Sequence, residues 1–166
     1  MAKTPIAFTH NGDERAVFVD DGQNLLDMLR RTAGDLTPKY GCGQGTCGAC
    51  TVLVDGAPQL ACITLAETVD GRRIDTVAGL AAGQGGGRLS PLQKAFMDNF
   101  AAQCGYCTDG MLMSATALLA RNPRPSRDEV VEAISGNLCR CTGYEAIINA
   151  VLQAASGGGS AQAGRR

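Results

Sequence analysis

Several features that mark common classes of protein are absent from this chain of 166 residues. It contains no Trp, and aromatic residues make up only 4%, so aromatic packing contributes little to its stability. Lys and Arg number 15 against 16 Asp and Glu, and this balance provides no basic field that would attract nucleic acid. No apolar run is long enough to span a bilayer. We therefore expect neither a nucleic-acid partner nor a membrane span.

The chain also shows no targeting signal. Its N-terminus lacks the apolar segment of a signal peptide, and the Arg30-Arg31 pair lies too deep for a twin-arginine signal. These absences predict a soluble, cytoplasmic protein, in which reduced thiols favour metal ligation over disulfides. The single histidine excludes a Rieske centre, which needs two histidine ligands. Because His10 stands beside a predicted hairpin turn, we expect it on the surface.

Cysteine, by contrast, is abundant, with eight residues in the chain. Three of them fall in the glycine-rich stretch 40–51, YGCGQGTCGACT. Glycine lets a backbone approach a bulky group closely and point several N–H groups toward it, and such groups stabilise metal-bound thiolates. The spacing C-x4-C-x2-C is typical of plant-type ferredoxins, whose thiolates hold a 2Fe–2S cluster. The predicted ligands are Cys42, Cys47, Cys50 and, after a short excursion, Cys62.

A small α+β unit is predicted around these four cysteines. Its predicted strands cover residues 4–10, 15–19, 51–54, 59–63 and 72–76. The Asn11-Gly12 and Asp55-Gly56 pairs indicate tight hairpin turns, and the second hairpin would bring Cys62 back beside the glycine-rich loop. A helix is predicted over 24–34, capped by its first residue and ended by Gly34.

The second half of the chain has a helical pattern. The predicted organisation is a first domain at 1–78, a Gly-rich linker at 79–89, a four-helix domain at 90–155 and a disordered tail at 156–166. The linker glycines are not followed by G-K-[ST], so they do not form a phosphate-binding loop. Ser90 is a predicted N-cap, and two capping boxes are predicted, Ser126 with Glu129 and Thr142 with Glu145.

Four further cysteines lie at the junctions between these predicted helices. They form a C-x2-C pair and a C-x-C pair: Cys104, Cys107, Cys139 and Cys141. An antiparallel bundle can place both junctions at one end, next to helix N-termini that favour anionic sulfur. A second four-thiolate metal site is therefore predicted. On spacing alone zinc remains an alternative, mainly for this second quartet, whereas a disulfide framework is disfavoured without a secretion signal.

Three motifs carry a family resemblance. They are G-C-G-Q-G-T-C-G-A-C-T-V followed by Cys62, then Q-C-G-Y-C-T-D-G-M, then G-N-L-C-R-C-T-G-Y. In this order they resemble the iron–sulfur subunit of the xanthine oxidase family of molybdenum hydroxylases, over residues 4–155. The resemblance implies an α+β fold, with a plant-type ferredoxin-like (β-grasp) domain followed by an all-α four-helix domain. Each domain would carry one 2Fe–2S cluster.

The resemblance also implies partners and an electron path. A large subunit would carry the molybdenum–pterin cofactor and a medium subunit FAD, in a heterotrimer that can assemble further into a dimer of heterotrimers. In relatives the glutamine at the position of Gln103 hydrogen-bonds the pterin, and Cys141 lies close to it. Single electrons would pass from molybdenum through the Cys104 quartet and then the Cys42 quartet to flavin. No residue of this chain would act as a catalytic acid, base or nucleophile.

One departure from the family and two alternatives accompany this interpretation. Asp109 stands where relatives commonly have Pro, and because Asp is favourable at a helix start we expect the fold to survive. A free-standing ferredoxin-like electron carrier and a zinc-bound interaction module remain open as functions. The substrate of a complex is not specified by this chain.

Overall fold

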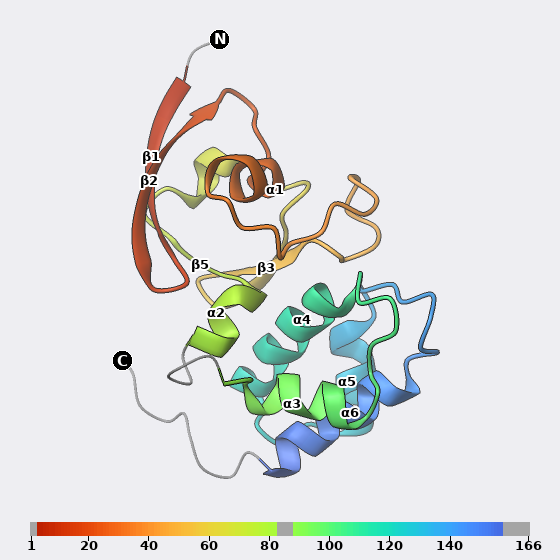
Figure 1. The fold of residues 1–166 in the computed structure, drawn as a ribbon. Helices are drawn as coiled ribbons and strands as arrows, with labels where there is room; N and C mark the ends of the chain where they lie inside the picture. The colour runs from red at the N-terminus through yellow and green to blue at the C-terminus, as the bar shows by residue number, and fades with distance from the viewer. Residues whose placement is uncertain (1–2, 83–87, 158–166) are drawn as a thin grey trace.

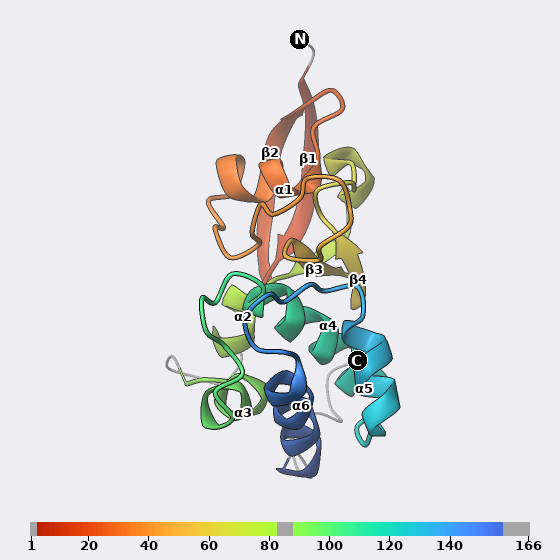
Figure 2. The same ribbon diagram turned by 90° about the vertical axis from the view of Figure 1, so that its right-hand side faces the viewer.

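The structure, a computed structural model, describes residues 3–82 and 88–157 (Figure 1). Its strands are β1 (Lys3–His10), β2 (Asp13–Asp20), β3 (Thr51–Val54), β4 (Ala57–Leu60) and β5 (Arg73–Asp75). Its helices are α1 (Leu25–Asp27), α2 (Val77–Ala82), α3 (Pro91–Asp98), α4 (Thr108–Arg121), α5 (Arg127–Ile134) and α6 (Glu145–Gly157), together with a π-helical turn η1 (Met28–Thr32) and a 3-10 helix η2 (Ala66–Val69). The strands form one unit, and α3 to α6 form a second unit below it (Figures 1 and 2).

The five strands form one mixed sheet in the order β2-β1-β5-β3-β4. β1 pairs in parallel with β5, and the other pairs are antiparallel. Both hairpins turn where predicted: Asn11 and Gly12 have φ values of 53° and 95°, and Asp55 and Gly56 have 50° and 81°. The predicted strand 59–63 was wrong in its bounds. β4 begins directly after the two-residue turn and ends at Leu60, so Cys62 lies in the turn that follows.

The sheet unit has its own hydrophobic core, which includes two of the cysteines. Its largest fully buried side chains are Phe8, Leu25, Leu26, Met28, Leu29 and Ile74, and Cys50 and Cys62 belong to the same cluster. The helix predicted over 24–34 is capped by Asn24 as expected, but after one turn it widens into η1. The N–H of Ala33 reaches the carbonyl of Met28, five residues back, at 3.0 Å. Gly34, with φ of 76°, ends the helix.

His10 is buried, so its prediction as a surface residue was wrong. It is 7% exposed, and its Nε2 lies 3.0 Å from Oδ2 of Asp35. The same carboxylate oxygen accepts a hydrogen bond from the hydroxyl of Thr76 at 2.6 Å. The parallel pairing of β1 with β5 brings Thr76 close to His10, and Asp35, in the loop after η1, contacts both side chains. They are distant in sequence, and the hairpin signal at Asn11 contains no information about them.

The helical unit has a second core around α4. Met111, Met113 and Ala115 on this helix are almost completely buried. The capping box of Ser126 with Glu129 is confirmed, and Ser90 forms another with Gln93. Within the described ranges, no helix combines the length and apolar character that crossing a membrane would require.

The capping box predicted for Thr142 and Glu145 was wrong. The Thr142 hydroxyl accepts from the N–H of Tyr144 at 3.2 Å and lies 3.1 Å from Sγ of Cys139. Glu145 instead pairs with Arg127 at 2.6 Å. The threonine is thus engaged by the cysteine loop, and α6 begins three residues later without this cap.

The predicted linker 79–89 also needs correction at its beginning. Helix α2 continues to Ala82, and Val77 and Leu80 pack against Leu53 of β3 and Met113 of α4. Residues 83–87 of the predicted linker lie outside the described residues. Residues 156 and 157 of the predicted tail belong to α6, and the rest of the tail lies outside the described residues. Residues 79–82 of the predicted linker are therefore part of a helix that packs between the two units.

Candidate metal centres

The glycine-rich loop wraps around two of its own sulfurs. Backbone N–H groups of Gln44 and Thr46 point at Sγ of Cys42, at 3.5 and 3.3 Å, and the N–H of Cys42 points at Sγ of Cys47 at 3.4 Å. A Cβ at Gly41 would lie only 2.7 Å from Sγ of Cys47, so a side chain at this position would displace the sulfur. The loop is shaped as a cradle for thiolates, as expected from its composition.

The first quartet contains thiols in two electrostatic settings. Hydrogen bonds from the Thr46 side chain and from the backbone of Gln44 and Thr46 lower the pKa of Cys42 to about 5. Burial raises the pKa of Cys50, and the neighbouring Cys62 thiol adds to the effect. Cys50 and Cys62 therefore form an inner pair inside the core, whereas Cys42 lies at the outer end of the loop.

The second quartet is assembled from two loops. Sγ atoms of Cys104 and Cys141 lie 3.6 Å apart, and both residues are exposed. Cys107, the N-cap of α4, contacts the partly buried Cys139, whose Sγ accepts from the N–H of Thr142 at 3.4 Å. The predicted meeting of these two junctions at one end of the helical unit is confirmed.

The thiols of the second quartet also differ in acidity. Burial raises the pKa of Cys107 to about 12. Burial acts in the same direction on Cys139, but hydrogen bonds from Thr142 outweigh it and lower the pKa. A hydrogen bond from the backbone of Tyr106 lowers the pKa of Cys104, whereas the hydrogen bond with Cys104 raises that of Cys141. Each contact pair thus joins one more acidic thiol with one less acidic thiol.

All eight thiols meet in pairs. The contact pairs are Cys42/Cys47, Cys50/Cys62, Cys104/Cys141 and Cys107/Cys139. Among the residues that the structure describes, no group of three or more Cys, His, Asp or Glu side chains forms a site for a single metal ion. A structural zinc site needs four ligands around one ion, whereas each iron of a 2Fe–2S cluster takes two protein ligands. The donor set therefore fits two 2Fe–2S clusters, which would supply one-electron redox chemistry.

Gln103 lies beside the exposed thiol pair. Its Nε2 donates to the carbonyl of Cys141 at 3.0 Å, and the residue is exposed. Gln103 and Cys141, the two residues predicted to lie at the pterin, are thus in contact, and their role toward the pterin stays a prediction. Sequence reasoning did not identify Thr46, Tyr106 and Thr142 as partners of the sulfurs. A threonine or tyrosine adjacent to a cysteine motif was the only local signal for them.

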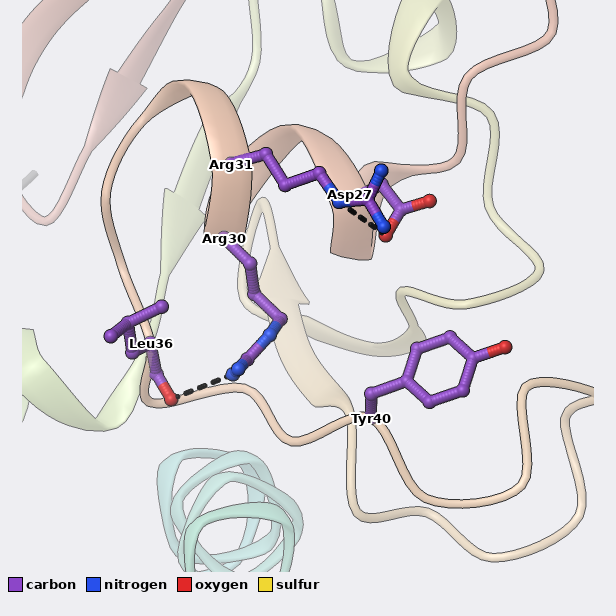
Figure 3. A pocket seen from close by; sticks show the side chains of 5 residues that line it. All are labelled: Asp27, Arg30, Arg31, Leu36 and Tyr40. Carbon is purple, nitrogen blue, oxygen red and sulfur yellow. Dashed lines mark hydrogen bonds and ion pairs between the residues drawn. The ribbon is translucent and has the colours of Figure 1, made fainter.

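A groove lies next to the first site, on the side of Tyr40 (Figure 3). It has a volume of about 430 Å³ and is lined by Asp27, Arg30, Arg31, Leu36 and Tyr40. Arg30 donates to the carbonyls of Leu36 and Pro38 at 3.0 and 2.8 Å, while Nε of Arg31 lies 3.7 Å from Asp27. The Arg30 guanidinium thus braces the segment that leads into the cysteine loop.

Both halves of the chain match family models of iron–sulfur-binding domains. Residues 8–77 match the family model of a 2Fe-2S iron-sulfur cluster binding domain, and residues 76–152 match that of a [2Fe-2S] binding domain. The nicotine 6-hydroxylase small subunit of Paenarthrobacter nicotinovorans is 54% identical over 87% of this chain and 85% of its own. The nicotinate dehydrogenase small FeS subunit of Eubacterium barkeri is 45% identical over 93% of this chain and 96% of its own. This chain belongs to the iron–sulfur subunits of the molybdenum hydroxylases.

A solved structure agrees with this family. A chain of quinoline 2-oxidoreductase from Pseudomonas putida 86 superposes with a TM-score of 0.88 at 49% identity, covering 93% of this chain and 94% of that one. As an iron–sulfur subunit of this family, the chain carries two 2Fe–2S-binding domains. The two matched regions meet at residues 76–77, where β5 gives way to α2. A zinc-bound module and a free-standing carrier are not favoured by these relatives.

Proposed function

We propose that this chain relays single electrons from a molybdenum–pterin centre in a large partner subunit to FAD in a medium subunit. Cys104, Cys107, Cys139 and Cys141 hold the cluster nearer to molybdenum, and Cys42, Cys47, Cys50 and Cys62 hold the cluster nearer to flavin. The observation that carries the proposal is the pairing of all eight thiols at two sites on adjoining loops. The sheet order β2-β1-β5-β3-β4 supports a β-grasp ferredoxin-like first domain, followed by the four-helix domain.

The chain's own residues position and tune the clusters. N–H groups directed at Cys42 and Cys139 stabilise negative charge on sulfur, while the burial of Cys50 and Cys107 opposes it. The two quartets differ in exposure, since Cys50 and Cys62 are buried whereas Cys104 and Cys141 are exposed, and we therefore expect the two clusters to have different reduction potentials. The exposed Cys104/Cys141 pair, with Gln103 beside it, is the face toward the large subunit. The complex is cytoplasmic and assembles as a heterotrimer or a dimer of heterotrimers.

The names of three relatives suggest a substrate class for the complex. Nicotine 6-hydroxylase, nicotinate dehydrogenase and quinoline 2-oxidoreductase are all named for nitrogen heteroaromatic compounds. We therefore take a nitrogen heteroaromatic ring as the substrate of the complex, with its specificity residues in the large subunit. Screening the purified complex with pyridines, quinolines, purines and aldehydes tests this assignment. Turnover of aldehydes alone would contradict it.

The direct test of the relay is metal and electron counting in the native complex. Two clusters correspond to about four irons per chain, with equal acid-labile sulfide. The isolated chain should be red-brown and reducible by dithionite but should turn over no substrate. Stoichiometric zinc with little iron in freshly purified protein would contradict the proposal. Substrate turnover by this chain free of partners would contradict it as well.

Gln103 provides a residue-level test of the relay. Gln103→Leu keeps most of the volume but removes the amide, which leaves pterin atoms unpaired at a cost of about 1–3 kcal/mol in local interaction. The complex should assemble, because one residue does not hold a large permanent interface. Rapid-freeze electron paramagnetic resonance (EPR) should show slower cluster reduction by substrate but normal reduction by dithionite. Gln59→Leu, at an exposed glutamine on β4, is the matched control. Native electron passage in Gln103→Leu with full cofactor content would exclude this role for Gln103.

A further inference from the structure

An ion pair joins the segment before the first cysteine loop to the start of α4. Nζ of Lys39 lies 2.8 Å from Oδ2 of Asp109. Lys39 precedes Cys42 by three residues, and Asp109 follows Cys107 by two. The pair therefore links two chain segments that carry ligands of different quartets. Helix α4, which begins here, packs against β3 of the sheet unit (Figure 1).

The ammonium group of Lys39 is held in place by all three of its N–H donors. Besides its bond to Asp109, it donates to the carbonyls of Leu36 and Thr37, each at 3.1 Å. The backbone N–H of Lys39 donates to the carbonyl of Ala49 at 3.1 Å. A lysine ammonium has three donors, so the whole donor capacity of this side chain is used at this position.

Both charges of the pair are largely shielded from water. The side chains are 30% exposed for Lys39 and 20% for Asp109. The Lys94–Asp98 pair on α3 is much more open, with side chains 69% and 42% exposed. Water and salt weaken the field of an exposed charge far more than that of a partly buried one. Lys39 and Asp109 therefore act more strongly on their surroundings than a surface pair does.

Tyr106 makes a second contact between the same two segments. Its hydroxyl donates to the carbonyl of Tyr40 at 2.6 Å. Tyr106 and Asp109 stand on either side of Cys107 in the chain, and Lys39 directly precedes Tyr40. The position of the ion pair relative to Cys107 is thus fixed by two contacts.

The carboxylate of Asp109 has an electrostatic consequence for the second site. Asp109 lies in the first turn of α4, whose N-cap is Cys107. One-electron reduction adds one negative charge to a 2Fe–2S cluster, and the charge around the cluster is one of the factors that set its reduction potential. A carboxylate without a counter-charge would therefore oppose reduction, because like charges repel. The ammonium of Lys39, 2.8 Å away, offsets this repulsion.

We propose that Lys39 is a compensating charge that keeps the second cluster readily reducible in the presence of Asp109. This proposal rests on the proposed relay function and assigns roles to two residues that bind no metal. Lys39 belongs to the sheet unit, whereas Asp109 and the second quartet belong to the helical unit, so one domain adjusts the potential of the cluster in the other. Asp109 stands where relatives commonly have Pro, and a chain with that proline would not need this compensation.

A redox titration of the full chain loaded with both clusters tests the proposal. Dithionite supplies the electrons, and EPR measures the ratio of reduced to oxidised second cluster, whose signal is identified as the one that Cys139→Ser damages. At the native midpoint potential, this ratio should fall several-fold in Lys39→Met, because the carboxylate is then unopposed. It should rise several-fold in Asp109→Asn, because the ammonium is then unopposed. Lys94→Met removes a lysine from the exposed pair on α3, and this matched control should keep the native ratio.

The double variant Lys39→Met/Asp109→Asn separates charge compensation from a structural role. It lacks the ion pair, but it also lacks both unopposed charges, so its ratio should return toward the native value. A merely structural contact would be lost in both single variants, and their ratios would then change in the same direction. The double variant would not reverse such a change.

The outcomes also distinguish this proposal from the relay itself. Native ratios in both single variants would overturn the compensating role of Lys39, and so would changes of the same sign. A double variant as far from the native ratio as Lys39→Met would overturn it too. A native chain whose spectra show no pair of 2Fe–2S clusters before the titration would instead contradict the proposed function.

Discussion

Hydrogen bonds from two threonines make Cys42 and Cys139 more acidic than an ordinary cysteine. The side chain and N–H of Thr46 lower the pKa of Cys42, and Thr142 does the same for Cys139. These threonines would leave more charge on one sulfur than on its partner. They influence the potential of a bound cluster without being ligands themselves. Hydrogen bonds also determine the pKa of Asp35, a buried carboxylate beside the β1–β2 hairpin.

Asp35→Asn should reduce stability in a pH-dependent way. Burial by itself would raise the pKa of Asp35, but hydrogen bonds from His10, Thr76 and Thr37 outweigh burial and hold the pKa well below its usual range. A carboxylate with a lowered folded-state pKa stabilises the fold above its ordinary pKa of about 3.9, and this contribution is lost as pH falls through the folded-state value. At neutral pH the variant should lose about 1.5–3 kcal/mol in free energy of unfolding, as expected for hydrogen bonds to a charged group.

Urea unfolding from neutral pH down to about pH 3 measures this effect. The gap between native protein and Asp35→Asn should narrow below about pH 4. Asp21→Asn, at an exposed carboxylate after β2, is the matched control and should show a small gap at every pH. Acid damage to clusters affects all three proteins alike. A constant gap for Asp35→Asn across the whole range would contradict the role of the ionised carboxylate.

At the level of elements, α5 carries the segment that joins the two sites. The N–H of Asn137 donates to the carbonyl of Ile134 at the end of this helix at 2.9 Å. The next residue, Leu138, donates its N–H to the carbonyl of Cys47 in the other cysteine loop. The start of the helix is fixed by the reciprocal box of Ser126 and Glu129. A stable α5 therefore anchors the loop that holds Cys139.

Ser126→Ala should destabilise the chain without changing either cluster. Loss of an N-cap serine costs about 1 kcal/mol, because an N–H of the first turn loses its acceptor. Thermal unfolding of the cluster-loaded chain should show the loss, while EPR spectra stay native. Thr142→Ala is the complementary variant, since this hydroxyl lies at Sγ of Cys139 and caps no helix. It should alter one EPR signal. A changed cluster spectrum in Ser126→Ala would show that the cap affects the site.

At the scale of the molecule, the described residues form two larger hydrophobic cores and a small cluster of Leu53, Met113 and Ala117. One core surrounds the sheet and the other surrounds α4, while Cys50 and Cys62 belong to the first and Cys107 and Cys139 adjoin the second. Clusters bound at these positions would cross-link each unit. In small domains such metal-binding energy is folding energy.

Removing iron with a chelator should therefore loosen the loops before the sheet. We expect a lower unfolding temperature and faster amide hydrogen exchange in residues 40–50 and 135–144, because these loops lose the cluster that their cysteines bind. The β1–β2 hairpin, which is held by a continuous ladder, should keep its protection.

In the loaded chain, Cys47→Ser and Cys139→Ser should each damage a different one of two EPR signals. Loss of a single shared signal in both variants would mean that the quartets are wrongly grouped.

Short-range patterns were enough to predict much of this protein from its sequence. The turns at Asn11-Gly12 and Asp55-Gly56 and the box at Ser126 depend on residues that are neighbours in the chain, so the sequence reports them directly. Cysteine spacing likewise predicted two quartets, because a metal-binding loop carries most of its ligands within a few residues. The family resemblance followed from these same local motifs.

Only the tertiary structure decided which groups meet across the chain. The burial of His10 against Asp35 and the hydrogen bond from Leu138 to Cys47 both join distant residues. No local period or motif encodes such a partner. Thr142 shows a second limit, because two local patterns competed for its hydroxyl, which lies against the sulfur of Cys139 three residues earlier and does not cap α6. Local patterns report the preferences of a segment, and packing of the whole chain determines which of those preferences are met.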